Sequence, residues 1–145
     1  MTTPEETAAA RFDQGFNCAQ AVFSAFASQL GLEEKAALKL ASPFGGGVAR
    51  RGSICGAVSG ALMAFGLVHG AETPAGKEEI YRRSQELLRR FEDKHGSIFC
   101  RDLIGCDVST PAGRQEAAEK GVSRNICPGL VREAAGIARE MLAEG

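Results

Sequence analysis

The sequence of 145 residues has no tryptophan, one tyrosine and a net charge of only −1. A near-neutral chain lacks the basic surface with which a nucleic-acid-binding protein holds phosphates, so we expect no nucleic-acid partner. The sequence also contains no CxxC pair and no CxxCH segment. Their absence removes the local signals of a zinc ribbon, of a thioredoxin-type dithiol and of covalently attached c-type haem.

Neither a targeting segment nor a long apolar run is predicted from the sequence. The first residues are acidic, and no apolar stretch precedes a small-residue cleavage site, so no secretory signal peptide is predicted. The uncharged stretch 52–68 is at the lower limit for crossing about 30 Å of hydrocarbon, and glycine and serine dilute it. We interpret it as a buried central helix rather than a membrane span, and expect a cytoplasmic protein.

Proline and glycine divide the chain into helical segments. Prolines stand at positions 4, 74, 111 and 128, where helices would begin, and glycines follow most of the predicted helix ends. Alternating strand patterns flanked by hairpin turns are not found. The sequence predicts an all-α, single-domain bundle over residues 1–145, with seven or eight helices around the 53–68 segment. The expected helices cover residues 4–14, 18–30, 33–41, 53–68, 74–94, 100–105, 111–120 and 127–143.

The cysteines are the residues from which a function can be inferred. Four of them lie at or next to a predicted helix start, namely Cys18, Cys55, Cys100 and Cys127. Unpaired backbone N–H groups and the positive end of the helix dipole lower the pKa of a thiol at such a position. The resulting thiolate is the form that attacks disulfides and binds metals. Cys106 lies at a helix end, and we interpret it as a small buried apolar residue.

We expect Cys55 to be the reactive centre. It combines a helix N-terminus with the neighbouring Arg50 and Arg51 and with the glycine-rich loop 44–52. We therefore expect its pKa to be lowered, although burial against apolar side chains would raise it instead. The loop is not a P-loop, and we favour a connection whose glycines allow tight turns over an anion-binding nest.

The small residues of the central segment allow two interpretations. Gly56, Ala57 and Gly60 leave one helix face nearly bare, so that another helix or a flat cofactor can approach closely. Helix packing is the more frequent reason for such spacing, and we favour it. If a cofactor binds, these residues together with Arg50 and Arg51 are the expected contacts.

Residues 55–60 read CGAVSG, which has the form CGAxxG. With residues 17–20, 44–47, 100–105 and 127–128, this motif makes the chain resemble the C_GCAxxG_C_C family of redox-active proteins over nearly its whole length. The resemblance implies a redox role. It also implies that the family's four cysteines correspond to Cys18, Cys55, Cys100 and Cys127, which leaves Cys106 as the additional one.

Three functions remain open at this point. In the first, cysteine thiols cycle between dithiol and disulfide or carry electrons as thiolates, as a thiol-dependent oxidoreductase would do without a cofactor. In the second, the same four thiolates bind zinc or an iron–sulfur cluster, although closely spaced ligand pairs are missing. In the third, the chain is a helical interaction module with structural cysteines. The sequence does not identify the redox partner protein, and it leaves a homodimer open.

Overall fold

The computed structural model describes residues 2–145 and consists almost entirely of helices and their connections. The α-helices are α1 (Pro4–Asp13), α2 (Cys18–Ala27), α3 (Glu34–Ala41), α4 (Gly56–His69), α5 (Lys77–His95), α6 (Cys100–Ile104), α7 (Pro111–Glu119), α8 (Val122–Asn125) and α9 (Cys127–Glu144). Short 3-10 turns cover Ser28–Leu30, Ser42–Phe44 and Pro74–Gly76. Between residues 2 and 145 the only β-type pairing is an isolated antiparallel bridge between Ile54 and Phe99. The expected all-α fold is confirmed.

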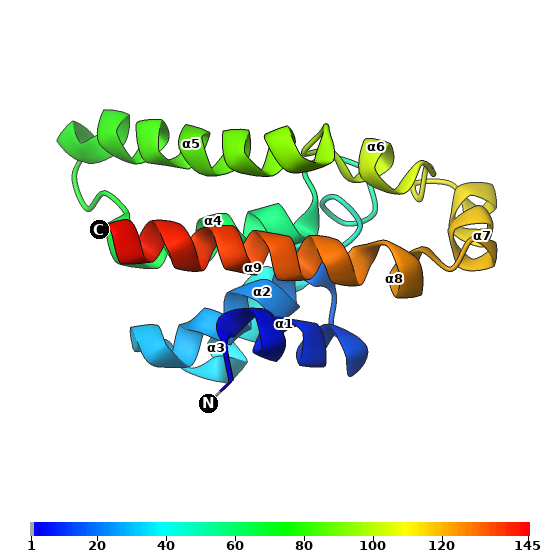
Figure 1. Ribbon diagram of the computed structural model, residues 1–145, viewed down its shortest axis with the longest axis horizontal. Helices are drawn as coiled ribbons and strands as arrows, with labels where there is room; N and C mark the ends of the chain where they lie inside the picture. The colour runs from blue at the N-terminus through cyan, green and yellow to red at the C-terminus, as the bar shows by residue number, and fades with distance from the viewer. Residues whose placement is uncertain (1) are drawn as a thin grey trace.

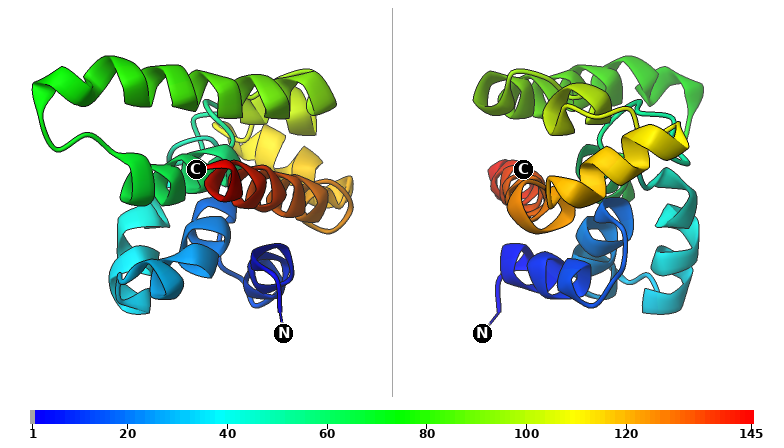
Figure 2. Two further views of the ribbon diagram at one scale, coloured as in Figure 1. Left: turned by 60° about the vertical axis from the view of Figure 1, so that its left-hand side comes forward. Right: turned by 90° about the vertical axis from the view of Figure 1, so that its right-hand side faces the viewer.

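The helices form three tiers around α4 (Figures 1 and 2). Helix α5 lies along one side, α4 and α9 occupy the middle, and α1, α2 and α3 lie on the opposite side. Helix α4 packs most extensively against α2, and also against α9 and α5. Its Val58 and Phe65 are completely or almost completely buried, as are Val22 of α2, Val131 of α9 and Phe91 of α5. The uncharged segment is thus the centre of the core, as expected.

The bounds of the central helix differ from the expected 53–68. Ile54 is extended, because it pairs with Phe99, and α4 begins only at Gly56. At the other end Leu67 and Val68 are 42% and 46% exposed, so the last turn leaves the core. The one-turn helix α8 after Gly121 was not expected. Within the part of the chain that the structure describes, no helix combines the length and apolarity needed to cross a bilayer.

The bare face of α4 contacts another helix. A Cβ atom built on Gly60 would lie 2.7 Å from the carbonyl oxygen of Ala19 and 3.1 Å from the Cβ of Val22, both on α2. Ala57 on the same helix is completely buried. Glycine therefore lets the two helices pack backbone against backbone, which is the interpretation that the sequence favoured.

Candidate functional site

Four cysteines that are distant in sequence line one cavity of about 250 Å³. Each comes from a helix start: Cys18, Cys100 and Cys127 are the first residues of α2, α6 and α9, and Cys55 is the N-cap of α4. The starts of these four helices therefore meet at the cavity. The fold therefore brings together the four positions that the sequence singled out, whereas Cys106 does not line the cavity.

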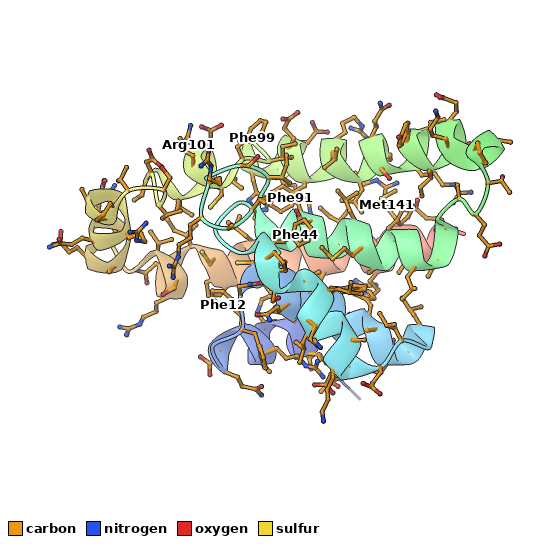
Figure 3. The ribbon with its side chains drawn as sticks, turned by 180° about the vertical axis from the view of Figure 1, so that it is seen from behind. Phe12, Phe44, Phe91, Phe99, Arg101 and Met141 are labelled. Atoms are coloured by element: carbon orange, nitrogen blue, oxygen red, sulfur yellow. The ribbon has the colours of Figure 1, made fainter. Side chains whose placement is uncertain are left out.

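Close packing of α2 on α4 places Cys18 beside the start of the central helix. A Cβ atom on Gly56 would lie 3.3 Å from the Cβ of Cys18 and 3.0 Å from the carbonyl oxygen of Phe44. Phe44 lies beside the start of α4 in Figure 3. The start of α2 is fixed by a capping box, in which the N–H of Gln20 donates to Asn17 Oδ1 and the N–H of Asn17 donates to Gln20 Oε1.

Backbone hydrogen bonds around the isolated bridge hold Cys55 next to Cys100. The N–H of Cys55 donates to the carbonyl of Ile98 over 2.8 Å, and the N–H of Cys100 donates to the carbonyl of Ser53 over 2.7 Å. These two bonds tie the start of α4 to the start of α6. Cys55 and Cys100 are therefore positioned by main-chain contacts rather than by side chains alone.

The cavity lining is otherwise apolar. Phe12 reaches it from α1 (Figure 3), and further apolar side chains come from α6, α7, α8 and α9. Asn17 and Ser123 are the polar residues among those that the structure places in the lining, and none of these described lining residues carries a formal charge. No sequence signal indicated the α7 residues Ala117 and Ala118, because their proximity to the cysteines depends entirely on the turn between α6 and α7.

The Cys18 and Cys127 thiols form an asymmetric pair. A hydrogen bond from the Cys18 side chain lowers the pKa of Cys127, against the opposing effect of its own burial. The same hydrogen bond raises the pKa of Cys18 well above its ordinary value, and burial and the neighbouring thiols add to this. Both residues remain partly exposed. Cys127 is thus the thiol of the pair that more readily becomes a thiolate.

The expected lowering of the pKa of Cys55 is wrong. Burial raises this pKa and outweighs the backbone N–H groups of Ala57 and Val58, which act in the expected direction. Cys55 is only 3% exposed. Arg50 and Arg51 are exposed and do not line the cavity, so they do not offset the loss of solvent. Burial likewise raises the pKa of Cys100, to about 12.

The glycine-rich loop contains a left-handed turn. All five residues from 46 to 50 have φ between +49° and +72°, including Val48, Ala49 and Arg50. The loop packs against the site, since a Cβ atom on Gly47 would lie 2.8 Å from the Cβ of Cys100. Arg101 of α6 donates to the carbonyl of Arg51, and lies beside the loop in Figure 3. The glycines do allow a tight turn, but the turn also holds three residues with side chains in a strained conformation.

We expect Val48→Gly to raise the free energy of unfolding by about 1 kcal/mol, because a left-handed conformation costs a residue with a Cβ roughly 1–2 kcal/mol. Urea denaturation followed by circular dichroism measures the change. Val68→Gly is the matched control, since Val68 is similarly exposed but helical. That control should lose about 0.5 kcal/mol. A loss in both variants would contradict the strained turn.

Cys106 is buried next to residues of the cavity lining but does not itself line the cavity. Its Sγ lies 3.6 Å from the carbonyl oxygen of Ile104, to which it donates a hydrogen bond, and it packs in a small cluster with Val108 and Val122. This agrees with its interpretation as a small apolar core residue.

All five cysteines are free thiols. Among residues 2–145, no group of three or more histidine, cysteine, aspartate and glutamate side chains is arranged to hold a metal ion.

Comparison with known proteins identifies the family to which the chain belongs. The chain matches none of the curated proteins and none of the solved structures with which it was compared. A family model matches residues 16–141, a range that includes the four cavity cysteines and the CGAxxG motif. The chain therefore belongs to the family described as "Putative redox-active protein (C_GCAxxG_C_C)".

Proposed function

We propose that this chain is a cytoplasmic, single-domain thiol–disulfide redox protein in which Cys18 and Cys127 are the reactive pair. One observation carries the proposal: the two partly exposed thiols line the same cavity, where the side chain of Cys18 lowers the pKa of Cys127. A low pKa is what makes a thiol reactive at neutral pH, because the thiolate is the nucleophile. A neighbouring second thiol then allows the reaction to end in a disulfide.

The proposed reaction has two exchange steps. The Cys127 thiolate attacks one sulfur of a disulfide substrate, so that a mixed disulfide forms and one substrate thiolate leaves. The Cys18 thiolate then attacks the Cys127 sulfur, forming the Cys18–Cys127 disulfide and releasing the second substrate thiolate. Two electrons pass from the protein dithiol to the substrate, and the two thiol protons leave with its halves.

The pair is suited to this order of attack. The largest cause of the raised pKa of Cys18 is its hydrogen bond to Cys127. Once Cys127 is part of a mixed disulfide, it no longer carries a thiolate that accepts this bond. The first step therefore removes the largest cause of the raised pKa of Cys18, which makes the attack by Cys18 easier only after that step. Cys55 and Cys100, with raised pKa values, are protonated thiols at neutral pH and are buried in the lining of the same cavity.

The second candidate is a four-cysteine zinc or iron–sulfur site. It is favoured by one observation, which is that Cys18, Cys55, Cys100 and Cys127 line the same cavity. Structural zinc needs four ligands at about 2.3 Å in a tetrahedron. The described side chains do not form such a group, so metal binding would require the thiols to move.

We expect a Cys18–Cys127 disulfide when anaerobically purified, reduced protein is treated with one equivalent of an exchangeable disulfide. Mass spectrometry of non-reduced peptides identifies the bond, and dithiothreitol should reverse it. Cys106→Ser is the control that should oxidise like the wild type. A different cysteine pair, or no oxidation at all, would contradict the proposal. Stoichiometric zinc or iron in the purified protein, lost when Cys55 or Cys100 is replaced, would favour the second candidate instead.

A further inference from the structure

The cavity in front of the reactive pair is small. Its volume of about 250 Å³ lies below the range of roughly 300–1,000 Å³ that is usual for sites that take drug-sized ligands. Part of this space adjoins the four thiols themselves. A substrate that reaches Cys127 through this cavity must therefore be small, which excludes the docking of a folded protein's disulfide deep inside it.

The described part of the cavity lining also has no acidic or basic side chain beside the Cys127 thiolate. Apolar groups such as Phe12, Val122 and Leu130 line it, and the described lining residues include no acidic or basic side chain. Asn17, one of its polar residues, already uses its side chain in the cap of α2 and in a 3.0 Å hydrogen bond to the carbonyl of Ser42. Apart from the Cys127 thiolate, which the reaction itself consumes, an ammonium or carboxylate group would find no charged partner among the described lining residues to replace its lost hydration, which is unfavourable.

We infer that the substrate of this site is a small, uncharged disulfide, and that the apolar lining selects it against charged disulfides of the same size. This inference rests on the proposed function and adds its substrate class. The overall change is that the protein dithiol and R–S–S–R give the Cys18–Cys127 disulfide and two R–SH, in which R carries no charge. The substrate is reduced by two electrons, and each thiolate that leaves takes up one of the two thiol protons.

Three disulfides of matched length test the inference: bis(2-hydroxyethyl) disulfide is neutral, cystamine is a dication and dithiodiglycolate is a dianion. Oxidation of the reduced protein is followed at pH 7 by mass spectrometry of the Cys18–Cys127 bond. Each rate is divided by the rate of the same disulfide with 2-mercaptoethanol, which removes intrinsic differences in reactivity. We expect the normalised rate of the neutral compound to exceed that of each charged one by at least about tenfold, a ratio equivalent to 1.4 kcal/mol.

A charge placed at the cavity should change this preference. Ala118 lines the cavity from α7 and is exposed, so that Ala118→Glu can be accommodated. In this variant we expect the normalised rate of cystamine to rise at least about threefold relative to the neutral compound. Ala112→Glu is the matched control, because Ala112 is exposed on the same helix but outside the lining, and it should leave the ratio unchanged.

The outcomes separate the inference from the proposed function. Equal normalised rates, or a faster reaction of either charged compound, would overturn the inference while the Cys18–Cys127 disulfide still formed. A faster dianion would mean that the exposed Arg50 and Arg124 outside the cavity, rather than its lining, select the substrate. If none of the three disulfides oxidises the pair, the proposed function and the inference fail together.

Discussion

Cys18→Ala is expected to slow the alkylation of Cys127 by iodoacetamide at pH 7, whereas Cys18→Ser leaves the rate close to that of the wild type. The alanine removes the hydrogen bond that lowers the pKa of Cys127, and the burial that raises this pKa remains. The serine hydroxyl is still a donor, although it cannot form a disulfide. The two variants therefore separate the hydrogen bond from the covalent chemistry of Cys18.

Two opposing influences set the size of this effect. Below the pKa, each unit by which it rises reduces the thiolate fraction tenfold. The thiolate that remains is more nucleophilic, with a Brønsted coefficient of about 0.4–0.5, so the net loss is about threefold per unit. In a profile of rate against pH, the wild-type midpoint should lie below the ordinary cysteine value, and the Cys18→Ala midpoint should move upward.

The control for the alkylation experiment is Cys106→Ala, because Cys106 is not part of the cavity lining. This variant should retain the wild-type rate and midpoint at Cys127. If Cys18→Ala and Cys18→Ser slow the reaction equally, or if neither does, the hydrogen bond between the two thiols does not set the reactivity of Cys127.

Gly60→Ala is expected to be the most destabilising conservative substitution on α4, by about 1–3 kcal/mol. Its Cβ would lie 2.7 Å from the carbonyl oxygen of Ala19 and 3.2 Å from the backbone nitrogen of Phe23. These are backbone atoms of α2, which cannot shift as easily as the end of a flexible side chain. The helices α2 and α4 must therefore move apart. Because Cys18 begins α2, this movement should also weaken the Cys18–Cys127 pair.

The same helix supplies the matched control. A Cβ atom on Gly66 would meet no other atom within 4 Å, and the substitution Gly66→Ala should stabilise the protein by about 0.5–1 kcal/mol through helix propensity. Chemical denaturation of the two variants, followed by circular dichroism, gives the free energies of unfolding. Equal effects at the two positions would contradict the close contact between α2 and α4.

The helical fold could be predicted because its signals are local. Pro4, Pro111 and Pro128 occupy first-turn positions, and Gly31 and Gly96 end helices in the left-handed conformation. The bounds of α4 were less predictable, since Ile54 is held extended by Phe99, which is far away in the sequence. Local patterns contain no information about such a pairing.

For the candidate site, only the identity of its cysteines could be predicted from the sequence. The position of the cysteines at helix starts identified Cys18, Cys55, Cys100 and Cys127, but not which two form the asymmetric pair. That depends on burial, which raises the pKa of Cys55, and on the contact between the starts of α2 and α9. The left-handed conformation of Val48 was equally invisible, because a β-branched residue disfavours it.

The order in which the cysteines of the reduced wild-type protein are alkylated tests the central claim most directly. Limiting iodoacetamide is added at pH 7 under anaerobic, metal-free conditions, and peptide mapping by mass spectrometry gives the modified fraction of each cysteine. The pairing of Cys18 with Cys127 predicts that Cys127 is modified first and that Cys55, Cys100 and Cys106 lag behind. Modification of Cys55 or Cys106 before Cys127 would contradict it.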